Sequence, residues 1–165
     1  MSVKVVRDRS GEILKAIRAL TKNQVLIGIP AEASDRQPEP GEAEPLNNAL
    51  IGYLMEHGEP AQNLPARPHL IPGVEEVRDR MVAQLRKAGE GALSGDLDAI
   101  SRGQHAAGLI GQNAVRAKIT DGGFAPLSER TLARRKAKGR TGDKPLIDTG
   151  QYRRAQTYVI REKGK

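Results

Sequence analysis

The placement of the prolines is what most limits the fold of this 165-residue sequence. Four of the ten prolines lie in segment 30–45, and four more lie in segment 59–72. Proline fixes its own φ angle and biases the preceding residue toward extended geometry, so regular helices are expected outside these two segments. Segment 30–45 also holds five acidic residues and no bulky apolar side chain, which predicts a mobile acidic loop. Segment 59–72 is predicted to be a stiff extended arm.

Apolar residues elsewhere in the chain recur at the spacings of helices and strands. Spacings of three and four residues predict five helices, over 12–20, 46–57, 73–88, 97–119 and 128–138. Runs rich in β-branched residues predict strands over 3–6, 24–29 and 155–161. We therefore predict one α+β domain over residues 1–165, with a small, mainly antiparallel sheet packed against several α-helices.

Glycines and caps refine the boundaries of these helices. Ser10 is a plausible N-cap of the first helix, and Gly58 is expected to end the second. The glycine-rich segment 89–95 predicts a hinge, after which Asp96 caps the longest helix. That helix carries three glycines, each of which costs about 1 kcal/mol relative to alanine. Because small residues allow another backbone to approach closely, we expect this helix to be packed at Gly103, Gly108 and Gly111.

The formal net charge of +7 is concentrated in segment 116–165, which holds 14 basic and 5 acidic residues. This basic C-terminal third predicts contact with a polyanion or with a negatively charged protein surface. Leu127 and Leu132 would face inward, so that the basic residues of helix 128–138 line its outer side. The predicted basic surface consists of Arg134, Arg135, Lys136, Lys138, Arg140 and Lys144. A solvated helix face without a partner remains the alternative.

Several classes of chemistry find no support in the sequence. Cysteine is absent, which excludes disulfides and thiolate metal sites. The histidines His57, His69 and His105 lack the spacing of a metal motif. The triplet 148–150 (DTG) is similar to that of aspartic proteases, but the apolar run before it is short, so it is interpreted as a turn. We expect no enzymatic activity, no cofactor and no metal, and we predict a soluble chain without a signal peptide or membrane span.

Three blocks, in order along the chain, carry a resemblance to a known family. The first is 48–58 (NALIGYLMEHG), the second is 65–70 (PARPHL), and the third runs from Phe124 to Tyr152 and includes LARRK and PLIDTGQY. Together they resemble the tail completion and head–tail joining (neck) proteins of long-tailed lambda-like and Mu-like bacteriophages. His57 and His69 stand where that family has aromatic residues.

The resemblance implies a structural virion protein that forms a homomeric ring, commonly six-fold, which completes the tail and joins it to the head. Implied partners are a head connector or stopper protein, a tail terminator or tail tube protein, and genome DNA that passes through the lumen without sequence recognition. The chain would be located in the virion, at the neck or tail, after assembly in the host cytoplasm, and would not contact a membrane.

A proline-braced arm is ordered in advance, so it could lie on a neighbouring subunit at low entropic cost. The expected subunit interface consists of Tyr53, Glu56, His57, Pro65, Arg67, Pro68, His69 and Leu70. In the alternative interpretation, Arg67 and Leu70 hold the arm to its own domain.

A small basic nucleic-acid-binding protein is the second hypothesis for function, supported by the charge of the C-terminal third. Aromatic residues that could stack on bases are scarce, and no helix-turn-helix or RNA-recognition pattern is present. A nucleic-acid binder should bind duplex with a steep salt dependence, whereas a neck subunit should assemble and bind DNA weakly.

Overall fold

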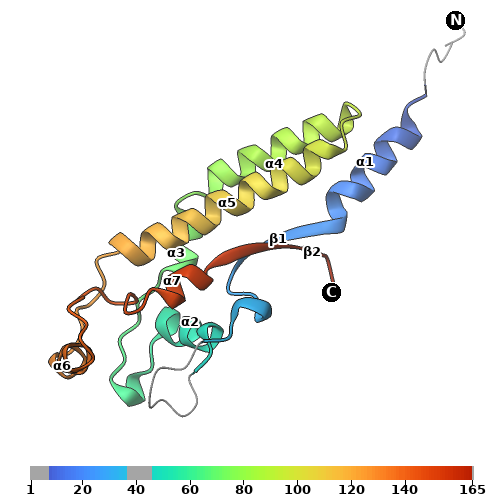
Figure 1. The fold of residues 1–165 in the computed structure, drawn as a ribbon. Helices are drawn as coiled ribbons and strands as arrows, with labels where there is room; N and C mark the ends of the chain where they lie inside the picture. The colour runs from blue at the N-terminus through green and yellow to red at the C-terminus, as the bar shows by residue number, and fades with distance from the viewer. Residues whose placement is uncertain (1–7, 37–45, 165) are drawn as a thin grey trace, which may run out of the picture.

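The longest helix, α5 (Asp98–Asp121), is the element against which most of the chain packs. The computed structural model describes residues 8–36 and 46–164, and Figure 1 shows their arrangement. Buried residues recur every three or four positions along one side of α5: Ile100, Gly103, Ala107, Gly111, Val115 and Ile119. Three of these six, at 103, 107 and 111, are glycine or alanine. The prediction that this helix is packed through its glycines is therefore confirmed.

Helix α4 (Arg78–Leu93) runs antiparallel to α5 and forms a long hairpin with it (Figure 1). The two helices approach closely, because a Cβ added at Gly103 would meet Ala88, and one added at Gly91 would lie 2.7 Å from the Cβ of Ala99. The predicted hinge over 89–95 is thus wrong for its first half, where glycine serves close packing within α4. The chain turns at 94–97. The N-cap position of α5 is Leu97 and not Asp96 as predicted, although Asp96 Oδ1 accepts the N–H of Ala99 (3.2 Å).

Two antiparallel strands form the sheet, β1 (Asn23–Gly28) and β2 (Thr157–Glu162). Ile27 pairs with Tyr158, and both side chains point toward α5. A Cβ at Gly108 would meet the Tyr158 ring, so the glycine of α5 makes room for the sheet. These two strands confirm the predictions over 24–29 and 155–161, whereas the predicted strand over 3–6 lies outside the described residues. Glu32 and Arg161, 129 positions apart, add an ion pair at 2.9 Å.

Helix α1 (Ser10–Lys22) leads directly into β1 and lies against the end of the α4–α5 hairpin. Its buried residue is Ala16, which packs with Ala92 and Ile100. The larger apolar residues Ile13, Leu14 and Ile17 are exposed. Ser10 is the first helical residue and not the N-cap; its own N–H is accepted by the carboxylate of Asp8 at 2.8 Å.

The proline-rich segment 59–72 forms most of the connection between α2 (Asn48–His57) and α3 (Leu70–Glu75) and the first residues of α3. Gly58 ends α2 with a φ of 77°, and a Cβ there would lie 2.7 Å from the backbone nitrogen of Ala66. The chain then forms the short 3-10 helix η2 (Pro60–Gln62) and reverses through Asn63, which is left-handed. A single extended arm over 59–72 is therefore not confirmed. The predicted helix over 73–88 is divided into α3 and α4 by a turn near Glu76.

Two further helices complete the described chain, α6 (Glu129–Ala137) and α7 (Gln151–Ala155). Ser128 caps α6, since its side chain accepts the N–H of Thr131. Tyr152 of α7 packs with Val115 and Ile119 of α5 in the second of two small cores. Of the predicted loop 30–45, the structure describes a 3-10 turn, η1 (Ala31–Ala33), and residues up to 36; positions 37–45 lie outside the described residues.

Candidate functional site

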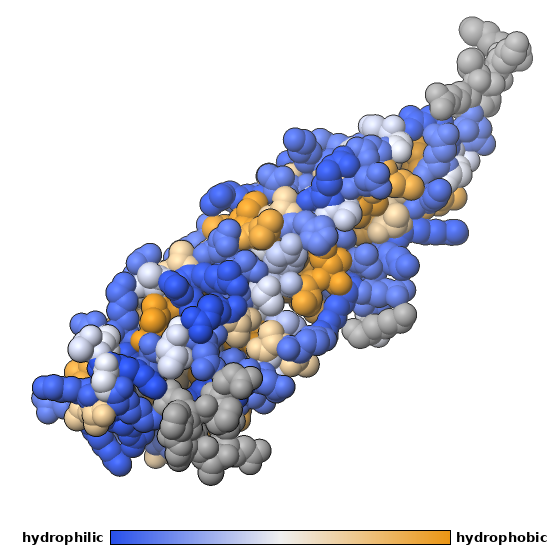
Figure 2. Space-filling model, viewed as in Figure 1, coloured by the Kyte–Doolittle hydropathy of each residue, from blue (hydrophilic) through white to orange (hydrophobic). Residues whose placement is uncertain are grey.

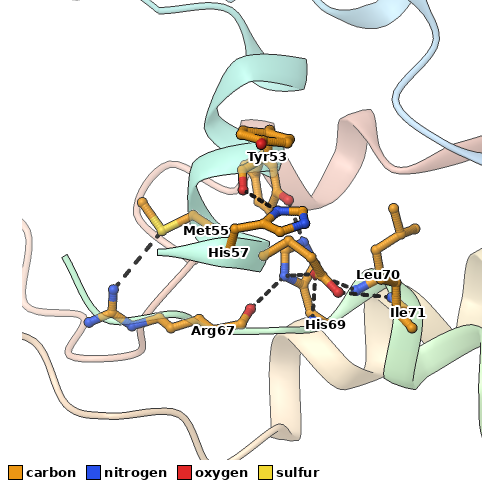
Figure 3. A network of polar contacts seen from close by, with 9 residues as sticks. Tyr53, Met55, His57, Arg67, His69, Leu70 and Ile71 are labelled. Carbon is orange, nitrogen blue, oxygen red and sulfur yellow. Dashed lines mark hydrogen bonds and ion pairs between the residues drawn. The ribbon is translucent and has the colours of Figure 1, made fainter. Parts of the chain in front are cut away.

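Glu56, near the end of α2, holds the start of α3 in place. Its carboxylate accepts three backbone N–H groups, those of His69 (2.8 Å), Leu70 (2.9 Å) and Ile71 (3.0 Å). Figure 3 shows these three residues from close by, with Arg67 and the end of α2. These N–H groups belong to the first turn of a helix and have no partner within it. Burial raises the pKa of Glu56, but the three N–H groups and the nearby His69 outweigh burial and hold it below its ordinary value.

His69 joins this carboxylate to the C-terminal part of the chain. Its side chain is 1% exposed; Nδ1 lies 2.8 Å from the carbonyl oxygen of Arg67 and 3.2 Å from Glu56 Oε2, and Nε2 contacts the hydroxyl of Tyr152. An imidazole ring with its hydrogen on Nδ1 donates a hydrogen bond to the Arg67 carbonyl oxygen, and its Nε2 accepts a hydrogen bond from the Tyr152 hydroxyl. Burial, and then the charge of Glu56, raise the pKa of Tyr152, which keeps the hydroxyl available as a donor.

We call Glu56, His69 and Tyr152 the clasp. The clasp connects α2, the start of α3 and α7, three elements that are distant in sequence. His69 and Tyr152 are both buried. Their contact, together with the bonds to Glu56, fixes the α2–α3 connection against α7.

A cavity of about 330 Å³ lies beside the clasp. Tyr53 is 63% exposed at its rim and stacks on His57, with ring centroids 4.5 Å apart. The structure thus gathers five of the eight predicted interface residues around this cavity: Tyr53, Glu56, His57, His69 and Leu70. The contact of this region with a neighbouring subunit stays a prediction.

Arg67 and His69 require a correction to that prediction, because both side chains find their partners within the chain. The Arg67 side chain is 5% exposed, and its guanidinium donates to the carbonyl oxygens of Ala125 (3.3 Å) and Pro126 (3.4 Å). Its backbone N–H donates to the Met55 carbonyl at 2.6 Å. These contacts correspond to the alternative in which the arm is held to its own domain. Pro65 and Pro68 are exposed.

The predicted basic surface is divided by the structure. Arg135 is 9% exposed and donates to the carbonyl oxygens of Gly142 (2.9 Å) and Lys144 (3.0 Å). It therefore holds the following loop against α6 and is not a surface cation. Asp148 pairs with Arg140 at 2.5 Å and lies 3.5 Å from Arg135. The Lys144 ammonium group donates to the carbonyl oxygen of Thr120 at 3.0 Å. Four cations of the predicted set are exposed: Arg134, Lys136 and Lys138 on and just after α6, and Lys144 in the loop that follows.

A second, larger cavity of about 900 Å³ lies between α2, the segment 62–67, the start of α6 and the segment 146–152. Among the described residues, four arginines line it, Arg36, Arg67, Arg134 and Arg135, together with one carboxylate, Asp148. Sequence reasoning did not find this site. Its cations come from separate segments, and only Arg134 and Arg135 are neighbours in the sequence.

Within residues 8–36 and 46–164, no group of three or more His, Asp or Glu side chains is arranged to hold a metal ion. Among these same residues, no helix has both the length and the apolar character that crossing a bilayer requires. In comparisons of the sequence and the structure with known proteins, no family model, no curated protein and no solved structure matches the chain.

Proposed function

We propose that this chain is a structural subunit of a bacteriophage neck, which assembles into a homomeric ring that completes the tail and joins it to the head. DNA would pass through the lumen of the ring, and the partners would be a head connector or stopper and a tail terminator or tail tube protein. The observation that carries the proposal is the apolar face that α1 turns toward solvent.

That face consists of Ile13, Leu14 and Ile17, all exposed, on the side of α1 next to the buried Ala16. Single exposed apolar residues are ordinary, but three adjacent on one helix mark a surface that another protein covers. The hydrophobic core of the chain is correspondingly small. Among the described residues, nine hydrophobic side chains are buried, five of them alanines, whereas thirteen large hydrophobic side chains are exposed.

The shape of the subunit also suits a ring. Helix α1 lies at one end of an elongated molecule, and α2 and α6 lie at the other (Figure 1). Figure 2 shows apolar surface in separate areas along this long axis, between hydrophilic ones. An interface between two unlike surfaces repeats from copy to copy, and it closes into a ring when the rotation permits.

The basic surface favours DNA binding less than its sequence suggested. Arg135 is buried and Arg140 pairs with Asp148, which reduces the charge that can face a phosphate backbone. A conduit that must release its DNA requires only weak, sequence-independent attraction.

Immunogold electron microscopy of intact phage particles, with an antibody raised against the full chain, tests the location. Label at the head–tail junction supports the proposal, and label elsewhere on the particle overturns it.

Assembly is tested separately, by native mass spectrometry and electron microscopy of the full chain with and without its neck partners. The double variant Ile13→Ser/Ile17→Ser should fail to form rings, while Lys15→Ser/Arg18→Ser, on the charged flank of the same helix, should form them. Rings from both variants would overturn the role of the α1 face. Tight duplex binding with a steep salt dependence, by a chain that stays monomeric with its partners, would favour the nucleic-acid hypothesis instead.

A further inference from the structure

Helix α4 carries three large apolar side chains that are exposed. Leu85 is 40% exposed, Leu93 is 43% exposed and Val82 is 44% exposed. Gly89 lies midway between the two leucines, four residues from each, so Leu85, Gly89 and Leu93 form one ridge along the helix. We call these three residues the α4 ridge. Exposed apolar residues that are adjacent on one helix face indicate a surface that another protein covers.

Gly89 is the unusual member of this ridge. At Gly91, Gly103 and Gly108 of the same helical hairpin, an added Cβ would collide with a neighbouring side chain, which explains why each is glycine. A Cβ added at Gly89 meets nothing within 4 Å in residues 8–36 and 46–164, although glycine within a helix is less stable than alanine. The space above Gly89 therefore admits the backbone of a second helix, which a larger side chain would hold away.

The ridge has the same spacing in both directions from Gly89. One leucine precedes the glycine by four residues, and the other follows it by four. An antiparallel copy of the helix, placed with its own glycine over Gly89, therefore brings its Leu93 beside Leu85 and its Leu85 beside Leu93. This reciprocity is what a two-fold contact requires. Ridges of this spacing pack with the helix axes crossing at about 50°, and here each helix has glycine at the crossing point.

The charges beside the ridge also suit a second copy. The neighbouring row of α4 contains Arg86 and Glu90, and both residues are exposed. In an antiparallel pair of identical helices, the same flank of each helix comes together, so Arg86 of one copy lies within reach of Glu90 of the other. A second copy of this chain therefore supplies both the apolar and the charged groups that match the ridge.

We propose that α4 is a second interface between copies of this chain, an antiparallel helix pair related by a two-fold axis at Gly89. Leucines of the two ridges interdigitate, and two ion pairs between Arg86 and Glu90 flank them. The inference goes beyond ring formation and does not require it, because the α4 ridge lies on a different helix from the α1 face and joins like surfaces. One helix pair is smaller than a standard interface, so the dimer should dissociate at micromolar concentrations.

Sedimentation velocity of the full chain, without neck partners, tests the proposal. The natural chain should change from monomer to dimer between about 1 and about 100 μM. Gly89→Gln should raise the dimer dissociation constant at least about tenfold, because its side chain occupies the centre of the contact. Ala83→Gln is the matched control: Ala83 is exposed on the same helix, about a third of a turn from Gly89, and its substitution should change the constant less than about twofold. A chain that stays monomeric throughout, or equal losses in the two variants, would overturn the proposal.

The melting temperature of the dilute chain separates loss of the contact from loss of the fold. At about 1 μM, where the monomer prevails, Gly89→Gln should not lower it, because glutamine is a better helix former than glycine and meets open space there. A lower melting temperature would mean that Gly89 is packed within its own chain, which contradicts the proposal.

Charge reversal identifies the partner as a second copy. Arg86→Glu leaves two negative charges at positions 86 and 90, and Glu90→Arg leaves two positive ones, so each variant alone should dimerise more weakly than the natural chain. Mixed in equal amounts, the two variants should form a mixed dimer, because the negative flank of one faces the positive flank of the other. Native mass spectrometry distinguishes this dimer by its mass. A mixture that associates no better than either variant alone would contradict the two-fold arrangement.

The α1 face and the α4 ridge are tested on different variants. Ile13→Ser/Ile17→Ser should dimerise as the natural chain does, and Gly89→Gln should still form rings with the neck partners. Loss of the dimer in the α1 variant would assign the contact to α1 and overturn the proposal for α4, whereas loss of rings in that variant alone concerns only the proposed function.

Discussion

Replacing Glu56 with glutamine should destabilise the chain by about 3 kcal/mol. The carboxylate accepts three backbone N–H groups within 3.0 Å, and hydrogen bonds to a charged acceptor contribute about 1.5–3 kcal/mol each. Glutamine keeps one acceptor oxygen but loses the charge, and its amide nitrogen would face an N–H group that it cannot accept. Because bonds that share one group are not additive, the loss is smaller than three times the single value.

The measurement is urea unfolding followed by far-UV circular dichroism at neutral pH, together with the melting temperature. For a chain of this length the melting temperature should fall by about 6–12 °C. Glu75→Gln is the matched control, since Glu75 is an exposed residue at the C-terminal end of α3 whose carboxylate lies 3.9 Å from Arg78. That exposed pair should contribute less than about 0.5 kcal/mol. If Glu56→Gln costs no more than the control, the interpretation of Glu56 as the anchor of α3 is wrong.

Three further outcomes follow from the same contacts. Gly108→Ala should destabilise the chain by about 2–3 kcal/mol, because its Cβ would enter the Tyr158 ring, and calorimetry would detect this as a lower melting temperature. Gly89→Ala, at a helical position with nothing within 4 Å, should raise stability by about 0.5–1 kcal/mol in the same assay, and a loss there would argue against a helix at 89–93. The stabilisation by Glu56 is complete above its unfolded pKa of about 4.5 and disappears as the pH falls through its lowered folded value. Melting temperatures measured between pH 6 and pH 3 should therefore decrease more steeply for the natural chain than for Glu56→Gln, and parallel curves would contradict this.

The parts of the fold that the sequence predicted are those decided by local pattern. The strand over 24–29 and the start of the helix at 128 each depend on residues close together in the chain, and each is confirmed. The small residues of the long helix also predicted that it is packed, although not which elements pack against it. The errors concern residues whose role depends on a distant partner. Gly91 has the composition of a hinge residue, yet it lies within α4 because Ala99 packs against it.

The same distinction explains what was missed in the candidate site. His69 was recognised as standing at an aromatic position, but its contact with Tyr152 joins positions 83 apart and has no local signal. Arg135 has the spacing of an outward basic residue on α6, whereas Leu132, expected to face inward, is exposed. The Arg135 guanidinium turns inward because it donates to the carbonyl oxygens of Gly142 and Lys144, which only folding brings close to α6.

The pairing of β1 with β2 also has a consequence for synthesis. Ribosomes add about 5–20 residues per second, so the first strand waits on the order of 10 seconds for its partner to be translated. During this interval the β-branched run at 24–29 has both hydrogen-bonding edges unoccupied, a state that favours association with other nascent chains. Shielding that short run until translation reaches residue 162 is therefore expected to raise the yield of native chain.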